Sequence, residues 1–288
     1  MKNEIKYIPN DGLPCLKIGP WALEKYQILK YYCEIFSTGM KNRWDKLIYI
    51  DLFSGPGFAE VKDKQKLVES SPMIALKVRA PFSKYFFCDT RENLCVLKKR
   101  VDKLGMNDKV KYFPGDCNKS VDEVIKEILS EKGKRVLSFC FVDPFNLNIK
   151  FNTIKKLANN GNIDFLILLA LPMDAKRNMS HYIKSGNNKL DEFLDNPNWR
   201  VEWLQAKKKG EPLMLFLSEQ YAVNMANLGY IKLPINKMVP IRSYEKNLPL
   251  YYLAFFSRNE KGYIFWKQVL QYSRKQPELP FEIDWSIK

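Results

Sequence analysis

The chain has 288 residues, of which 46% are hydrophobic and 14% are aromatic. This composition excludes a disordered chain and suffices for one large core, or for one core that carries an inserted subdomain. The 47 Lys and Arg residues against 32 Asp and Glu residues give a net charge of +15. Such an excess favours a polyanionic partner, with nucleic acid first, although a merely lysine-rich surface would have the same charge.

Cysteine spacing and hydropathy exclude two further classes of protein. The six cysteines form no Cys-x-x-Cys pair, and His181 is the one histidine, so we expect no metal site. The first residues contain no apolar signal core, and the longest apolar run, residues 165–173, is too short to span a bilayer. We therefore expect a soluble, cytoplasmic protein without a membrane association.

In chain order, residues 1–45 are predicted to form an N-terminal arm and a helix, which Gly19-Pro20 begins. An apolar strand over residues 47–52 contains Asp51 and leads into the turn Gly55-Pro56-Gly57. Residues 58–68 are polar and predicted to be irregular, and a helix follows over 71–78. Further strands are expected at 84–89, 110–113, 136–142 and 163–171, with helices at 93–104, 122–131 and 151–158. This alternation is typical of a parallel sheet with helices on both faces.

Beyond Pro172 the pattern changes. Residues 174–208 are polar and basic, and we expect them to form a helical insertion. A helix over 212–228, two strands at 237–244 and 250–257, and a last helix over 262–273 follow. The late hairpin predicts one antiparallel strand at the sheet edge. Residues 46–288 are thus expected to form one mixed α/β domain, a mostly parallel sheet of about seven strands.

Acidic residues mark the ends of four successive predicted strands: Asp51, Asp89, Asp116 and Asp143. In a parallel sheet these ends lie at one edge, where ligands bind. The dinucleotide fingerprint fails because its third glycine position is Glu60, and no phosphate-binding Gly-Lys loop occurs. The pattern instead fits a nucleoside without phosphates. One carboxylate can accept from ribose hydroxyls and the next from an adenine amino group, as S-adenosylmethionine (SAM) requires.

Several short runs carry a resemblance to known proteins: Gly19-Pro20-Trp21 with Lys25, the run from Tyr49 to Gly57, Gly115-Asp116, Phe141-Val142-Asp143-Pro144-Phe145, and Pro249-Leu250-Tyr251-Tyr252. On these residues the chain resembles the Rossmann-like class I methyltransferases, and among them the three-Cys-motif partner (TcmP) family, over roughly residues 15–270. The resemblance implies a class I methyltransferase sheet, SAM as cofactor and a possible protein partner. It also implies that the cofactor is bound by Asp51, Phe53, Gly55, Gly57, Asp89 and Asp116, with Cys117 beside the adenine and Lys25 as a candidate for the methionine carboxylate.

Asp143-Pro144-Phe145 is the predicted reaction centre. Amino-methyltransferases that act on bases have Asp or Asn, two prolines and an aromatic residue here; this chain has one proline fewer. By that resemblance Asp143 accepts hydrogens of the target amine and Phe145 stacks on the base. The basic segment 176–209 is the expected substrate-binding region, through stacking and phosphate contacts, unless it is only a helical insertion with a solvated face. Its candidate residues are Arg177, Lys184, Trp199, Arg200 and Trp203.

We thus expect a SAM-dependent methyltransferase acting on a nucleic-acid base, at an exocyclic amine, with RNA or DNA as the partner. Two alternatives remain open at this point. One is a catalytically silent subunit that keeps the methyltransferase fold and binds nucleic acid or protein. The other is a small-molecule methyltransferase whose positive charge is incidental.

Overall fold

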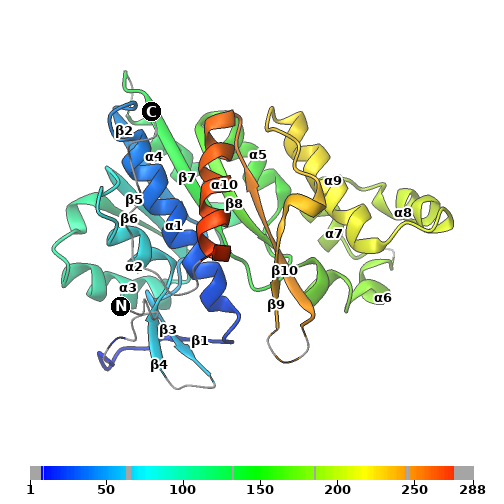
Figure 1. The fold of residues 1–288 in the computed structure, drawn as a ribbon, viewed down its shortest axis with the longest axis horizontal. Coiled ribbons are helices and arrows are strands. Elements are labelled where there is room, and N and C mark those ends of the chain that lie inside the picture. Colours follow the sequence, from blue (N-terminus) through cyan, green and yellow to red (C-terminus); the bar gives the residue numbers. More distant parts are fainter. Residues whose placement is uncertain are drawn as a thin grey trace.

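A computed structural model of the chain describes residues 8, 10–62, 66–131, 133–184, 186–243, 245 and 247–275. Most of the start of the predicted arm and the end of the predicted domain lie outside these residues. The main element is a seven-stranded sheet in the order β6-β5-β2-β7-β8-β10-β9 (Figure 1). Its strands are β2 (Lys46–Asp51), β5 (Lys84–Asp89), β6 (Val110–Pro114), β7 (Val136–Val142), β8 (Asn162–Leu169), β9 (Val239–Arg242) and β10 (Pro249–Phe256).

The first five strands of this sheet run parallel to one another, and β10 runs antiparallel to both β8 and β9. This is the Rossmann-like sheet expected from the sequence. One detail differs: the antiparallel strand lies one position in from the edge, and β9 is the edge strand. Leu253, Ala254, Phe255 and Phe256 of β10 are all fully buried, so this strand needs a neighbour on each side and cover on both faces.

Helices cover both faces of the sheet because side chains alternate across each strand. In β2, Ile48 and Ile50 face one core, and Leu47 and Tyr49 face the other. One face is covered by α1 (Ala22–Met40), α2 (Ser71–Leu76), α3 (Arg91–Asp102) and α10 (Glu260–Lys275). The other is covered by α4 (Cys117–Leu129), α5 (Phe151–Asn160) and α9 (Leu213–Asn227). On the outside of this layer α7 (Lys189–Leu194) packs against α5 and α9, and α8 (Trp199–Lys208) packs against α9.

A second, three-stranded sheet lies beside the carboxyl end of β2. It consists of β1 (Leu16–Ile18), β3 (Phe58–Val61) and β4 (Lys66–Glu69), with β1 parallel to β3 and β4 antiparallel to it. The expectation of an irregular segment at 58–68 was therefore wrong. The apolar side of β3 consists of Ala59 and Val61, both fully buried, and a small alanine makes the strand alternation hard to recognise in the sequence.

Residues 171–208 extend the chain away from the sheet (Figure 1). A π-helical turn, Leu171–Ala175, is followed by α6 (Met179–Tyr182), α7 and α8. Two 3₁₀ turns, Asn107–Lys109 and Ile235–Lys237, complete the regular elements of the described residues. Among the described helices none has the length and apolar character that a membrane-spanning helix needs.

Candidate active site

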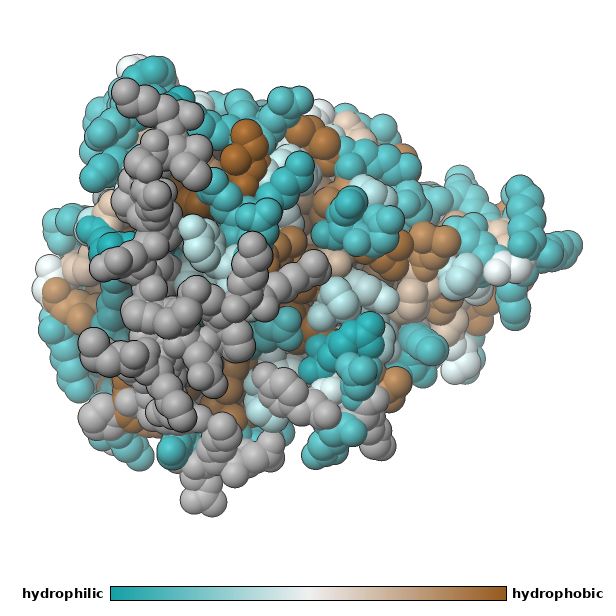
Figure 2. All heavy atoms as spheres, in the orientation of Figure 1, coloured by the Kyte–Doolittle hydropathy of each residue, from teal (hydrophilic) through white to brown (hydrophobic). Residues whose placement is uncertain are grey.

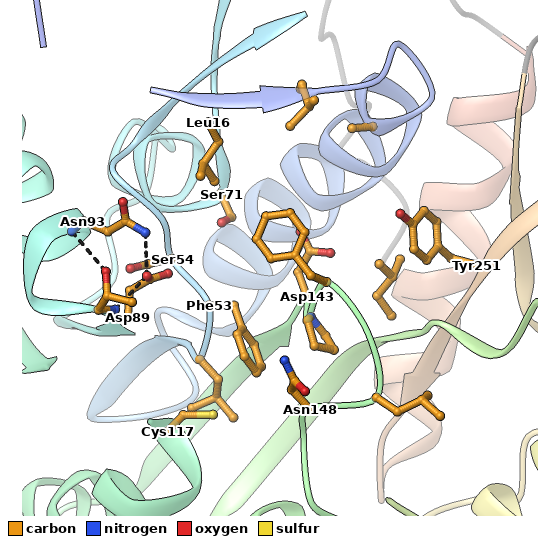
Figure 3. A pocket seen from close by; sticks show the side chains of 18 of the residues that line it. Leu16, Phe53, Ser54, Ser71, Asp89, Asn93, Cys117, Asp143, Asn148 and Tyr251 are labelled. Atoms are coloured by element: carbon orange, nitrogen blue, oxygen red, sulfur yellow. Dashed lines mark hydrogen bonds between the residues drawn. The ribbon is translucent and has the colours of Figure 1, made fainter. Parts of the chain in front are cut away.

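A cavity of about 1050 Å³ lies at the carboxyl ends of the parallel strands. Asp89 and Asn93 lie at one side of it, Phe53, Cys117 and Asn148 at its base, and Tyr251 of β10 at the opposite side (Figure 3). Leu16 of β1 lies across it from Phe53 (Figure 3). The topology thus brings together strand ends that are far apart in the sequence, as the strand-end acids predict.

Asp51 at the end of β2 is fully buried. The backbone N–H of Phe53 donates to its Oδ1 at 3.2 Å, and the Tyr49 hydroxyl donates to its Oδ2 at 3.2 Å. Burial raises the pKa of Asp51 from 3.8 to about 7, although the hydrogen bonds from the Ser71 hydroxyl and the Phe53 amide favour the charged form. Asp51 thus lies directly behind the cavity wall, which its neighbours Leu52 and Phe53 line, and it has no ion-pair partner among the described residues.

The glycine turn approaches Asp89 directly. The N–H of Gly55 donates to Oδ2 of Asp89 at 2.7 Å. Gly55 has a φ of +63°, and a Cβ there would lie 2.8 Å from Cδ1 of Leu16. Gly57 has a φ of +100°, but a Cβ there would meet the core residues Leu97 and Met73 at 3.0 and 3.2 Å. Gly55 thus allows β1 to lie against the turn, whereas Gly57 shapes the turn and lies against the core.

Asp89 at the end of β5 is held in a fixed orientation. Its Oδ1 accepts from the backbone N–H of Thr90 and from Nδ2 of Asn93, each at 2.7 Å. Asn93, in the first turn of α3, was not among the sequence candidates. An amide four residues after a strand-end acid at the start of a helix was the available signal.

Asp116 is the N-cap of α4 and accepts from the backbone N–H of Asn118 at 2.9 Å. It is exposed and lines the cavity, as does the buried Cys117. Burial raises the pKa of the Cys117 thiol to about 12, so this side chain is a neutral apolar surface and not a nucleophile. Beside the cavity the pair thus offers one hydrogen-bond acceptor and one small apolar contact.

The Asp143-Pro144-Phe145 loop follows β7 and borders the cavity. Oδ2 of Asp143 lies 2.5 Å from Nζ of Lys25 on α1, an ion pair with side chains only 14% and 11% exposed. The side chain of Phe145 is 70% exposed at the same cavity. The buried Asp174 holds the loop by accepting from the N–H of Leu147 at 2.9 Å.

The N-terminal arm is fastened to the glycine turn by Arg100 of α3. Its guanidinium donates to both carboxylate oxygens of Asp11 at 2.9 Å and to the carbonyls of Leu13, Pro14 and Pro56. All five N–H donors of the arginine are thereby used, and the side chain is 1% exposed. The arm then leads into β1, whose residues Leu16, Lys17 and Ile18 line the cavity.

The predicted substrate-binding residues do not gather at this cavity. Trp199 is fully buried and donates from Nε1 to Asp191 at 2.7 Å, and Trp203 is 8% exposed against Phe216. Both rings form core contacts, so neither is exposed to stack on a base as the sequence predicted. Arg200 pairs with Asp191 at 2.6 Å.

Arg177 and Lys184 are exposed, and neither lines the cavity. The outer end of the segment that carries α8 is mostly hydrophilic on the face shown in Figure 2. The periodicity of tryptophans along a helix indicates an apolar face, and here that face packs inward.

No protein-family model and no curated protein matches the chain. Solved structures do match at low similarity. An rRNA methylase from Streptococcus thermophilus is 8% identical, with 81% of this chain and 93% of that one covered and a TM-score of 0.35. Cofactor-bound Rv0187 from MTB is 11% identical, with 86% and 84% covered and a TM-score of 0.42. An O-methyltransferase family protein from Burkholderia thailandensis is 12% identical, with 83% and 59% covered and a TM-score of 0.36.

Proposed function

We propose that the chain is a SAM-dependent methyltransferase that acts on a nucleic-acid base. The observation that carries the proposal is a single cavity whose two sides present different functional groups. On one side Asp89 and Asp116 present carboxylates beside a glycine turn. On the other, Asp143-Pro144-Phe145 combines a hydrogen-bond acceptor with an exposed ring.

The residues fit the adenosine part of SAM. Asp89 is oriented by Thr90 and Asn93 through Oδ1 and by Gly55 through Oδ2, and a carboxylate can still accept from ribose hydroxyls through its remaining lone pairs. Asp116 would accept from the adenine amino group, with Cys117 and Phe53 against the ring. The cavity of about 1050 Å³ leaves room for an acceptor beside the cofactor.

The residues also fit the methionine part. Asp51 is a buried carboxylate that would gain from a nearby ammonium, and Lys25 is a cation with its side chain 11% exposed. When bound, SAM would supply an electrophilic methyl group on a sulfonium. The chain's own task is alignment, since an in-line displacement gains much of its rate from orientation.

Asp143 would accept hydrogen bonds from an exocyclic amine, and the ring of Phe145 would stack on the base. The net charge of +15 supports a polyanionic substrate. Lys17, Lys62 and Arg91, which are exposed and line the cavity, add local positive charge. A nucleic acid could thus place its backbone at the rim while one base enters the cavity.

Two measurements test this proposal. Calorimetry should show binding of SAM and S-adenosylhomocysteine to the wild type, and Asp89→Ala should weaken both by about 100-fold because a charge-assisted contact to the ribose is lost. Lys30→Ala, on the exposed face of α1, is the control for a surface change. Equal affinity in the wild type and Asp89→Ala would overturn the cofactor assignment.

Transfer of a labelled methyl group to total RNA, total DNA and protein, measured in parallel, tests the substrate. We expect label in one nucleic-acid fraction and its loss in Asp143→Ala. SAM binding without label in any fraction would favour a silent subunit. Label in a small-molecule extract alone would favour a small-molecule methyltransferase.

A further inference from the structure

One contact in the cavity that the proposed function leaves unexplained is the ion pair between Lys25 and Asp143. The two residues are 118 positions apart in the chain, and the N···O distance is 2.5 Å. Lys25 projects from α1, and Asp143 follows β7. Because both side chains are at least 86% shielded, the pair is a built feature of the cavity and not a fluctuating surface contact.

This pair conflicts with the role proposed for Asp143. Oδ2, one of the two oxygens that would accept from an acceptor amine, already accepts from the ammonium of Lys25, which also fixes the orientation of the carboxylate. Lys25 cannot leave without compensation, because Asp51 is a second carboxylate close enough to Asp143 for the charge of Asp143 to help raise its pKa. Withdrawal of the lysine would break the one ion pair that the described residues form with either of these two carboxylates, which is unfavourable in a buried site.

The methionine part of SAM carries one ammonium and one carboxylate, which can resolve this conflict. Lys25 and Asp143 line the same cavity as Ser71, which hydrogen-bonds Asp51. Asp143 lies apart from Asp89 in this cavity (Figure 3). An ammonium beside Asp51 would supply the compensating positive charge. A carboxylate would offer the ammonium of Lys25 an anion other than Asp143.

We propose that Lys25 is a latch that exchanges Asp143 for the carboxylate of the cofactor's methionine part, so that cofactor binding frees Asp143 for the acceptor. The inference rests on the proposed function. It makes Lys25 a positioning residue that enforces an order, cofactor first and acceptor second. In the cofactor-free protein Oδ2 of Asp143 is held by Lys25 and faces the lysine instead of an incoming amine.

Calorimetry with two ligands tests the exchange without any acceptor. S-adenosylhomocysteine has the amino-acid end and no sulfonium charge; 5′-methylthioadenosine lacks the amino-acid end. Asp143→Asn removes the competitor for Lys25 and should tighten S-adenosylhomocysteine binding about fivefold, while methylthioadenosine binding stays unchanged. Lys25→Met should weaken S-adenosylhomocysteine binding about tenfold or more and leave methylthioadenosine unchanged.

The double variant Lys25→Met/Asp143→Asn distinguishes the latch from simple repulsion between Asp143 and the carboxylate of the ligand. If Lys25 is the shared group, Asp143→Asn has no tightening effect once the lysine is gone. If the tightening persists in the Lys25→Met background, Asp143 merely repels the carboxylate and the latch is refuted. Lys62→Met, which removes another cation that lines the cavity, is the matched control and should change neither affinity by more than about twofold.

The remaining outcomes distinguish failure of the latch from failure of the proposed function. Unchanged or weaker S-adenosylhomocysteine binding in Asp143→Asn, with both ligands bound by the wild type, overturns the latch alone. Failure of the wild type to bind either ligand overturns the proposed function, and the latch with it. Circular dichroism and the unfolding midpoint of each variant establish that a changed affinity reflects the site and not loss of the fold.

Discussion

Asp51→Asn should make the ligand-free protein more stable, and increasingly so as the pH rises. The carboxyl is fully buried, and its pKa is raised from 3.8 to about 7 by burial. Because the pKa is raised in the folded state, ionisation of Asp51 costs the fold no stability below pH 3.8. Stability is then lost as the pH rises towards 7, because the unfolded chain ionises first.

The magnitude follows from the size of the shift. A shift from 3.8 to about 7 corresponds to about 4 kcal/mol of lost stability above pH 7. Between pH 5 and pH 8 the loss grows by about 3 kcal/mol. Asparagine has nearly the same shape and no charge, and its oxygen can still accept from the N–H of Phe53. The stability gap between Asp51→Asn and the wild type should therefore widen by that amount.

Urea unfolding of the ligand-free protein at pH 5 and pH 8 measures this gap. Asp164→Asn is the matched control, since burial raises the pKa of Asp164 to about 6 at a position outside the proposed active site. The stability that Asp164→Asn gains over the wild type should grow about half as much between pH 5 and pH 8, because the folded-state pKa of Asp164 is raised less. An Asp51→Asn gap that is equal at pH 5 and pH 8 would refute the reasoning, because Asp51 would then ionise as easily as an exposed carboxyl.

Three further variants test other parts of the site. Gly55→Ala should weaken S-adenosylhomocysteine binding about tenfold in calorimetry, because its φ is +63° and its Cβ meets Leu16; full recovery of affinity in Gly55→Ala/Leu16→Ala would show that the clash, and not the backbone, is decisive. Arg100→Met should cost about 3–5 kcal/mol in urea unfolding, since it leaves Asp11 and three carbonyls without their donor; a loss below about 1 kcal/mol would contradict the fastening role. Phe145→Ala, at 70% exposure, should change stability by less than about 0.5 kcal/mol while methyl transfer falls; unchanged transfer would remove the ring from the acceptor site.

The sequence predicted the sheet because strand and helix signals alternate with little interference. Runs such as residues 136–142 and 163–171 are apolar except for Ser138 and Asp164, as is typical of strands buried on both faces. Because the carboxyl ends of parallel strands lie at one edge of a sheet, the sequence alone predicts that Asp51, Asp89 and Asp143 lie at the same edge. Helix boundaries were less accurate: α4 begins at Cys117, since Asp116 is its N-cap, whereas the predicted helix began at residue 122.

Contacts between distant segments could not be predicted in this way. Nothing near Lys25 in the sequence indicates that its partner is Asp143, because that choice depends on how α1 packs across the sheet. The same holds for Arg100, which sits within a lysine-rich stretch that suggests a solvated helix face yet is 1% exposed. Trp199 shows the same limit for a predicted surface residue. An aromatic residue in a basic segment is typical of a nucleic-acid-binding surface, and only the packing shows that this ring faces inward.

Asp143 and Asp51 differ in whether a cation neutralises their charge, and this difference predicts that ligand binding releases a proton. Asp143 has Lys25 at 2.5 Å, whereas Asp51 has hydrogen bonds and no cation among the described residues. A ligand that brings an ammonium to Asp51 would lower its pKa from about 7. Binding of S-adenosylhomocysteine at pH 6 should then release about 0.9 proton per site, and at pH 8 about 0.1. Calorimetry in two buffers with different ionisation enthalpies measures this number. Release that is absent at pH 6, or that persists in Asp51→Asn, would show that the ammonium does not approach this carboxylate.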